Sequence, residues 1–205
     1  MPPQACNRHG AGVSLSVESN NAVQTGRRSV MISSLILISS PKFSHADDFV
    51  ESKSGLRYFD IKLGQGETPT VGDTCIVHWA GYTEGYQGKR IGNSSIRDEP
   101  FEFVLGKNQA IPAFEEACLG MAVGGIRRIQ IPGNHPELSY ARDRSKRFSS
   151  EDSGDSGFFR YAKGPQPFDL GGQRALDFVL DNNTLQDFNR TLLFDVKLLN
   201  IRKGL

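Results

Sequence analysis

The stretch PFEFVLGKNQAIPAFEEACLGM, residues 100–121, contains a strand, a turn and a helix in quick succession. Residues 101–105 alternate in side-chain character along the chain, which is typical of a strand with one buried face. In residues 111–119, a proline and two carboxylates fall in the first turn, where both are favourable. Phe114, Cys118 and Met121 then recur at helical spacing. The sequence predicts a half-buried strand followed directly by a short amphipathic helix.

Four further segments, on either side of this stretch, are predicted to be strands: 56–63, 74–82, 126–132 and 191–201. The second is rich in β-branched and aromatic residues. In the last, apolar side chains take every second position, namely Leu192, Phe194, Val196 and Leu198. The fold class that follows is α+β, with one helix packed against an antiparallel sheet.

A long insertion, residues 142–190, precedes the last predicted strand. Residues 142–157 are rich in charge, serine and glycine, and predict a solvated, mobile loop. Residues 164–168, GPQPF, have extended character. Residues 174–181 fit either a helical turn or a strand, and the pattern does not choose between them.

Composition excludes several classes of protein. The chain of 205 residues has 24 Lys and Arg against 23 Asp and Glu, so no basic excess is available for nucleic acid. No apolar run approaches the roughly 18 residues that a membrane span needs. The three cysteines form no zinc or disulfide framework, and the four histidines are scattered, which argues against a metal site. Cys75 and Cys118 fall on predicted core faces, where buried free thiols are favoured over a disulfide.

Residues 1–46 have the order of a cleavable targeting segment. An acid-poor leader is followed by Arg27 and Arg28, the apolar stretch 30–38 and a small-residue site at 44–46. Because nearly thirty residues precede the apolar stretch, a bipartite signal is predicted, with organelle import followed by a second translocation. The layout resembles that of precursors bound for the chloroplast thylakoid lumen. The alternative is that residues 30–38 are a buried strand or a short core helix.

Five sequence blocks carry a resemblance to a known family. They are VHWAGY at 77–82, PFEFVLG at 100–106, IPAFEE at 111–116, GMAVGG at 120–125 and LFDVKLL at 193–199. Their order and spacing resemble the FKBP-type peptidyl-prolyl cis-trans isomerases, over about residues 54–141 and 191–202. The resemblance implies one domain over 47–205, in which a twisted antiparallel sheet wraps around one short α-helix and an apolar pocket lies between them.

The same resemblance implies an isomerase that accelerates protein folding at X-Pro bonds. Rotation about such a bond crosses a barrier of about 18–20 kcal/mol and breaks no covalent bond. The catalyst needs a dry pocket that fits the twisted amide, and no nucleophile, metal or cofactor. The expected partners are proline-containing protein clients and subunits of photosynthetic complexes, and the expected state is a monomer.

Site residues follow from the resemblance, position by position. Aromatic walls are expected at Trp79, Phe101 and Phe194, with Phe114 as the floor of the pocket. Ile111 would offer its backbone N–H, and the Tyr140 hydroxyl would bond the bound peptide. The remaining substrate contacts are expected at the rim of the pocket, from Ile91, Arg97 and Ala110. Periodicity alone would place the four wall and floor aromatics in the core instead.

Two departures from the family pattern put catalysis in doubt. An aromatic residue followed by aspartate is replaced by Ile91 and Gly92, so weaker catalysis is expected, and Gly92→Asp would restore the carboxylate. The family's short Ile-Ile-Pro-like lip gives way to the insertion 142–190. Both favour an alternative function, a low-activity binding or assembly module in the thylakoid lumen. A third reading is a secreted isomerase, in which three glycosylation sequons would be used.

Overall fold

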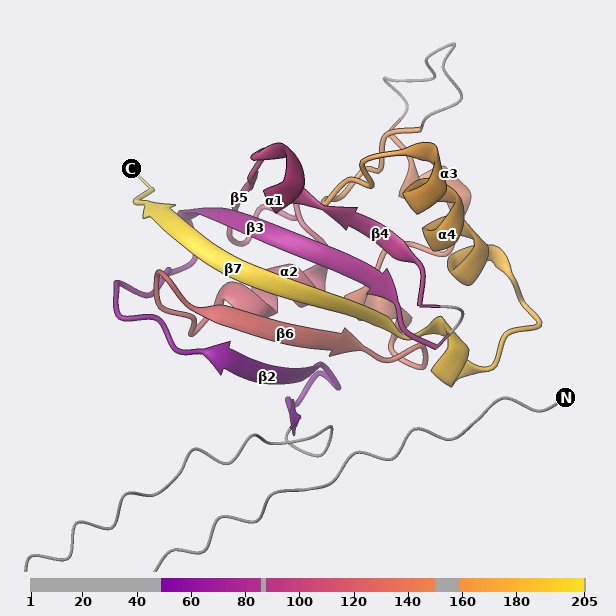
Figure 1. Ribbon diagram of the computed structural model, residues 1–205, viewed down its shortest axis with the longest axis horizontal. Coiled ribbons are helices and arrows are strands. Elements are labelled where there is room, and N and C mark those ends of the chain that lie inside the picture. Colours follow the sequence, from indigo (N-terminus) through magenta and orange to yellow (C-terminus); the bar gives the residue numbers. More distant parts are fainter. Residues whose placement is uncertain (1–48, 86–87, 150–158, 205) are drawn as a thin grey trace, which may run out of the picture. The chain divides into compact units, whose positions relative to one another are not determined.

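The computed structural model describes residues 49–85, 88–149 and 159–204, and within these ranges a seven-stranded antiparallel sheet forms the centre of the fold (Figure 1). The strand order is β1-β2-β6-β7-β3-β4, and β5 also pairs with β3. The bounds are β1 Val50–Glu51, β2 Arg57–Lys62, β3 Thr74–Thr83, β4 Arg90–Asn93, β5 Phe101–Val104, β6 Ile126–Ile131 and β7 Leu192–Arg202. The targeting segment predicted over 1–46 lies outside the described residues.

The two longest strands, β3 and β7, are neighbours in the sheet. Their register runs from Thr74 opposite Arg202 to Thr83 opposite Leu192, with a bulge early in β3. Every second residue of β3 is buried, as a strand with one face on a core requires. The five predicted strands are all present. The short β1 and β4 were not predicted, because β1 has only two residues and β4 has two adjacent buried residues, Ile91 and Gly92, in place of an alternating pattern.

The predicted helix is α2, Pro112–Cys118, and it lies against β6 and β7 on one face of the sheet. Its buried residues are Ala113, Phe114, Ala117 and Cys118. Cys118 hydrogen-bonds Cys75 of β3, and this contact together with burial raises the pKa of the Cys118 thiol. Both cysteines are buried and free, as predicted.

The insertion adds a second layer beside β4. It contains α3, Arg144–Arg147, α4, Leu170–Asp181, and the 3-10 turn η3, Asp187–Arg190. The segment 174–181 is therefore helical. Asp169 caps α4 by accepting a 2.6 Å hydrogen bond from the Gly172 N–H. A Cβ on Gly172 would lie 2.0 Å from the Ile91 carbonyl oxygen, so glycine permits α4 to approach β4 closely.

Two short turns complete the described elements, α1 (Ser94–Arg97) and the 3-10 turn η2 (Pro136–Leu138). The expectation of one helix is thus incomplete, since α4 is longer than α2. No helix in the described ranges has the length and apolarity needed to cross a bilayer.

The solvated loop expected over 142–157 is wrong at Arg147, which is fully buried, whereas residues 142–146 are exposed as expected. Residues 150–157 of that expected loop lie outside the described residues. The Arg147 guanidinium donates to Asp177 at 2.9 Å and to Asp181 at 2.5 Å, both on α4. It also donates to the backbone carbonyls of Ala141 and Arg142. Burial alone would lower the pKa of Arg147, but the bonds to the two carboxylates raise it overall. Charged residues of α3 and α4 therefore hold the insertion together.

Candidate functional site

Four aromatic rings predicted for the site lie in one row, contributed by four elements. The ring centroids of Trp79 and Phe194 are 6.1 Å apart, those of Phe194 and Phe114 are 5.2 Å apart, and those of Phe114 and Phe101 are 6.5 Å apart. The rings come from β3, β7, α2 and β5. Phe114 and Phe194 are fully buried, whereas Phe101 is half-buried and ends the row. Phe114 and Phe194 therefore belong to the hydrophobic core and pack against the two end rings, Phe101 and Trp79, respectively.

Two hydrogen-bond donors flank the row of rings. The Ile111 backbone N–H donates to the Gly164 carbonyl at 2.9 Å. The Tyr140 hydroxyl donates to the Pro165 carbonyl at 2.7 Å. Burial raises the pKa of Tyr140, so its hydroxyl keeps its proton and remains a donor. Both predicted donors are therefore in use, and both of their acceptors belong to the insertion.

Residues 161–168 of the insertion, here called the strap, run along the site. Gly164 forms a parallel bridge with Ala110, and its N–H donates to the Gln109 carbonyl at 2.9 Å. A Cβ on Gly164 would lie 2.4 Å from the Phe101 ring, so the strap backbone rests directly on that ring. The peptide bond between Gly164 and Pro165 is cis.

At the other end of the row the strap adds a ring of its own. Phe168 stacks on Trp79, with centroids 5.5 Å apart and planes within 11° of parallel. The Arg97 guanidinium lies 5.1 Å from the centre of the Phe168 ring, within the range of a cation–π contact. Two of the predicted rim residues, Arg97 and Ala110, thus contact the strap.

The third rim residue, Ile91, is buried on β4 beneath α4, and its neighbour Gly92 faces the rings. A Cβ on Gly92 would lie 2.6 Å from Cη2 of Trp79 and 3.0 Å from Cδ2 of Phe168. A side chain at position 92 therefore meets the rings of Trp79 and Phe168, and the effect of Gly92→Asp stays a prediction to be measured. The Trp79 indole occupies the volume that the introduced carboxylate would need.

The strap is held at its start by Tyr161, which is almost fully buried. The Tyr161 hydroxyl donates to Asp177 at 2.7 Å, and its ring meets the Tyr140 ring edge-on at 5.2 Å. Gln166 braces the turn, because its side chain accepts from the Tyr161 N–H and donates to the Tyr161 carbonyl, both at 2.8 Å. Sequence reasoning missed these residues. The one signal was the extended character of residues 164–168.

Next to Trp79, Ser94 contacts His78, and His78 in turn lies near Asp98. These three residues do not form a nucleophilic site. The Ser94 hydroxyl is 2.9 Å from Nδ1 of His78 and accepts from the Trp79 N–H at 2.8 Å. His78 Nε2 is 3.6 Å from the exposed Asp98. Since Ser94 is completely buried against backbone, its role is to position Trp79.

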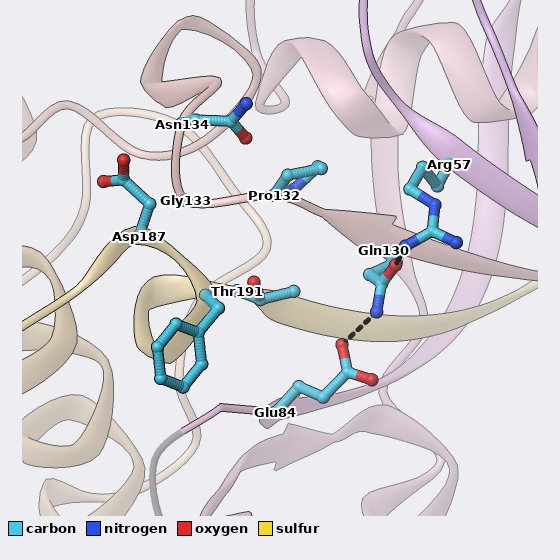
Figure 2. A pocket seen from close by; sticks show the side chains of 9 residues that line it. Arg57, Glu84, Gln130, Pro132, Gly133, Asn134, Asp187 and Thr191 are labelled. Atoms are coloured by element: carbon cyan, nitrogen blue, oxygen red, sulfur yellow. Dashed lines mark hydrogen bonds between the residues drawn. The ribbon is translucent and has the colours of Figure 1, made fainter. Parts of the chain in front are cut away.

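Two of the larger cavities in the described part of the chain lie outside the row of rings. One of about 580 Å³ is polar (Figure 2) and contains Gln130, which accepts from Arg57 at 2.7 Å and donates to Glu84 at 2.6 Å. None of the nine predicted site residues lines it. The other, of about 330 Å³, lies beside the strap and is lined by residues that include Tyr140, Lys146 and Lys163.

Comparison with known proteins shows the family to which the chain belongs. Residues 65–199 match the model of the FKBP-type peptidyl-prolyl cis-trans isomerases. The chain is 46% identical over 164 residues to "Peptidyl-prolyl cis-trans isomerase FKBP19, chloroplastic" of Arabidopsis thaliana, covering 75% of this chain and 56% of that protein. It is 38% identical over 106 residues to "Peptidyl-prolyl cis-trans isomerase FKBP20-2, chloroplastic" of the same plant, covering 52% of this chain and 42% of that protein.

The chain therefore spans about half the length of these curated relatives. Among solved structures, it is similar to FkpA from Escherichia coli, at 27% identity and a TM-score of 0.49, covering 80% of this chain and 56% of that chain.

Proposed function

Because the chain belongs to the FKBP-type peptidyl-prolyl cis-trans isomerase family, we propose that it catalyses rotation about X-Pro bonds in protein clients. The observation that carries the proposal is the row of four rings with two hydrogen-bond donors beside it. The proposed catalytic residues are Trp79, Phe101, Ile111, Phe114, Tyr140 and Phe194. The proposed substrate-binding residues are Ile91, Arg97 and Ala110.

The proposed mechanism rests on the polarity of the amide. Resonance places partial charge on the oxygen and nitrogen of a planar amide, and twisting the bond removes that resonance. A pocket lined by aromatic rings solvates the planar form poorly and therefore favours the twisted one. The Ile111 N–H and the Tyr140 hydroxyl are spaced to hold two consecutive carbonyls, which would fix the chain on both sides of the prolyl nitrogen.

To test the proposal, the rate of cis-to-trans relaxation of short X-Pro peptides is measured in the presence of the full chain. Phe101→Ala removes the half-buried ring at one end of the row and is expected to lower the catalysed rate at least tenfold. Phe188→Ala, at a largely exposed ring of η3, serves as the matched control and should leave the rate unchanged. Circular dichroism melting checks that both variants fold. Relaxation at the uncatalysed rate with both the unaltered chain and Phe168→Ala, the strap variant considered below, would contradict the proposal.

The proposed location is the chloroplast thylakoid lumen. Two features support it: the order of charge, apolar stretch and small residues in 1–46, and relatives whose names call them chloroplastic. Cleavage near residue 46 would release the domain 47–205. Import into isolated chloroplasts should give a shortened product inside the thylakoids, whereas an unprocessed product in the stroma would contradict the location.

The proposed partners are proline-containing clients, bound by a monomer. The alternative is a module that binds a photosynthetic-complex subunit with little catalysis, and Gly92 favours it because no carboxylate fits there. That alternative predicts peptide binding without acceleration. Measuring both peptide binding and the rate of cis-to-trans relaxation on the same preparation distinguishes the isomerase from the binding module.

A further inference from the structure

The strap already makes the contacts that a client peptide would need. The two donors beside the rings are bonded to the carbonyls of Gly164 and Pro165, which are consecutive in the chain and lie on either side of a prolyl nitrogen. A free client carbonyl has no access to the Ile111 N–H while the Gly164 carbonyl accepts from it, because one N–H serves one acceptor at good geometry.

The strap also makes the apolar contacts that a client peptide would make with the rings of the site. Gly164 rests on the ring of Phe101, and Phe168 stacks on Trp79, so the strap touches both ends of the row. Between these contacts Pro165 and Pro167 are buried. The strap excludes water from the rings in the way that a bound ligand does.

We infer that the strap is an internal ligand of the peptide pocket, and that a client chain binds by displacing it. The inference rests on the proposed function for the nature of the pocket. The strap also defines the class of chain that competes with it: a carbonyl, a proline and then an aromatic residue three positions after the proline, as in Gly164 to Phe168.

The strap is anchored at both ends, and between them its contacts with the site are ones that a client chain can also make. Tyr161 is buried and bonded to Asp177, and Asp169 caps α4. The Phe168 ring between these points is only partly buried. The hydrogen bonds to Ile111 and Tyr140 are each of modest net worth and would be replaced by identical bonds to a client. Displacement therefore exchanges equivalent contacts and leaves the two ends in place.

Space for an arriving chain lies next to the strap. The cavity of about 330 Å³ reaches from Lys163 on the strap to Tyr140. A client can therefore approach Tyr140 before the strap leaves. A pocket that is open only a fraction of the time binds its ligand more weakly by that fraction. Loosening the strap should accordingly tighten binding.

The experiment uses the full chain and a synthetic peptide of strap sequence, Tyr-Ala-Lys-Gly-Pro-Gln-Pro-Phe with blocked ends. Trp79 is the sole tryptophan of the chain, so its fluorescence reports on the ring stacked against it. Phe168→Ala removes that ring, and Phe188→Ala is the control. We expect Phe168→Ala to change Trp79 emission without peptide and to bind the peptide at least fivefold more tightly than the unaltered chain and the control do.

A second variant guards against misfolding. Gln166→Ala removes the brace to Tyr161 without touching a ring of the row, and it should also tighten peptide binding. A peptide ending in alanine instead of phenylalanine should bind all forms weakly.

The outcomes separate the two claims. Binding that is equal or weaker in both strap variants overturns the inference and makes the strap a fixed wall, even if the unaltered chain accelerates relaxation. Tighter binding in the variants, with no acceleration by any form, supports the internal ligand and overturns the isomerase instead. Tighter binding with faster relaxation supports both.

Discussion

At the scale of single residues, Gly92 and Trp79 act as a pair. The space above Gly92 is occupied by the Trp79 indole and the Phe168 ring, so a side chain at position 92 would overlap with both. Sequence comparison treats the absent carboxylate as a loss that can be reversed. The structure shows that a larger ring has replaced it.

We therefore predict that Gly92→Asp lowers stability and does not raise the isomerase rate. Overpacking a buried site costs about 1–3 kcal/mol of unfolding free energy, and an unpaired carboxylate adds to that. Gly92→Ala, which adds only a methyl group, should lose less. Urea unfolding and peptide relaxation of the three proteins provide the measurements. A faster rate in Gly92→Asp would contradict the overlap.

The family resemblance brought the four aromatic residues together at one site, but it did not predict what fills that site. Trp79 and Phe194 lie on the same face of the neighbouring strands β3 and β7, where Phe194 is opposite Gly81, two residues along from Trp79. The acceptor for Tyr140 is a carbonyl 25 residues away, in a segment with no periodicity to align it. A backbone acceptor leaves no trace in side-chain composition, so no inspection of residues 161–168 could reveal that bond.

At the scale of elements, α3 and α4 depend on each other. The basic run of 144–147 was legible in the sequence, but its partners Asp177 and Asp181 fell in a segment that fitted a helix or a strand equally. A strand would also put carboxylates four residues apart on one face, but about 13 Å from each other, whereas a helix brings them to about 6 Å, within reach of one guanidinium. Once α4 is helical, Arg147 reaches both carboxylates and becomes the buried centre of an ion-pair cluster, within a segment that was predicted to be a solvated loop.

Two arginines of α3 make a matched test of this cluster. The Arg147 side chain is 0% exposed, whereas that of Arg144 is 63% exposed and pairs with Asp181 at 3.4 Å. Arg147→Ala should cost about 3 kcal/mol of unfolding free energy, because it removes a fully buried guanidinium together with its bonds to two partly buried carboxylates and two backbone carbonyls. Arg144→Ala should cost less than about 1 kcal/mol, as exposed ion pairs do. Equal losses in urea unfolding would argue against a structural cluster around Arg147.

At the scale of the whole molecule, Asp73 joins the start of β3 to the end of the chain. Its carboxylate accepts from the N–H and hydroxyl of Thr70, and also from the Gly204 N–H and the Lys203 ammonium. The bonds from the Thr70 and Gly204 backbone hold the pKa of Asp73 well below its usual range. The stabilisation it provides is therefore complete above an unfolded-state pKa of about 3.9 and is lost as the pH falls toward the lower folded-state pKa.

Asp73→Asn should consequently destabilise the protein more at pH 6 than at pH 3. At pH 6 the native chain has an ionised carboxylate for all four donors, and asparagine cannot replace it. At pH 3, which is below the unfolded-state pKa but above the folded-state pKa, the first part of that advantage has gone. Urea unfolding at the two pH values measures the difference, and an equal loss at both would exclude Asp73 as a source of the acid dependence.

Strand alternation and the spacing of five blocks were enough to predict the sheet and α2, but not the placement of the insertion. The strands are regular and each has a buried face, so local sequence carries their signal. The insertion docks through single contacts, such as Gly172 against the Ile91 backbone, that depend on the finished sheet. Its position is a property of the tertiary structure.

The position of β7 has a consequence for the order in which the protein can be made. β7 pairs with β6 on one side and β3 on the other, so it alone joins the β1-β2-β6 part of the described sheet to the β3-β4-β5 part. Yet it is the last strand to leave the ribosome. Until residues 192–202 have been synthesised, the two parts of the described sheet have no strand to join them, so the complete sheet can form only once β7 is present.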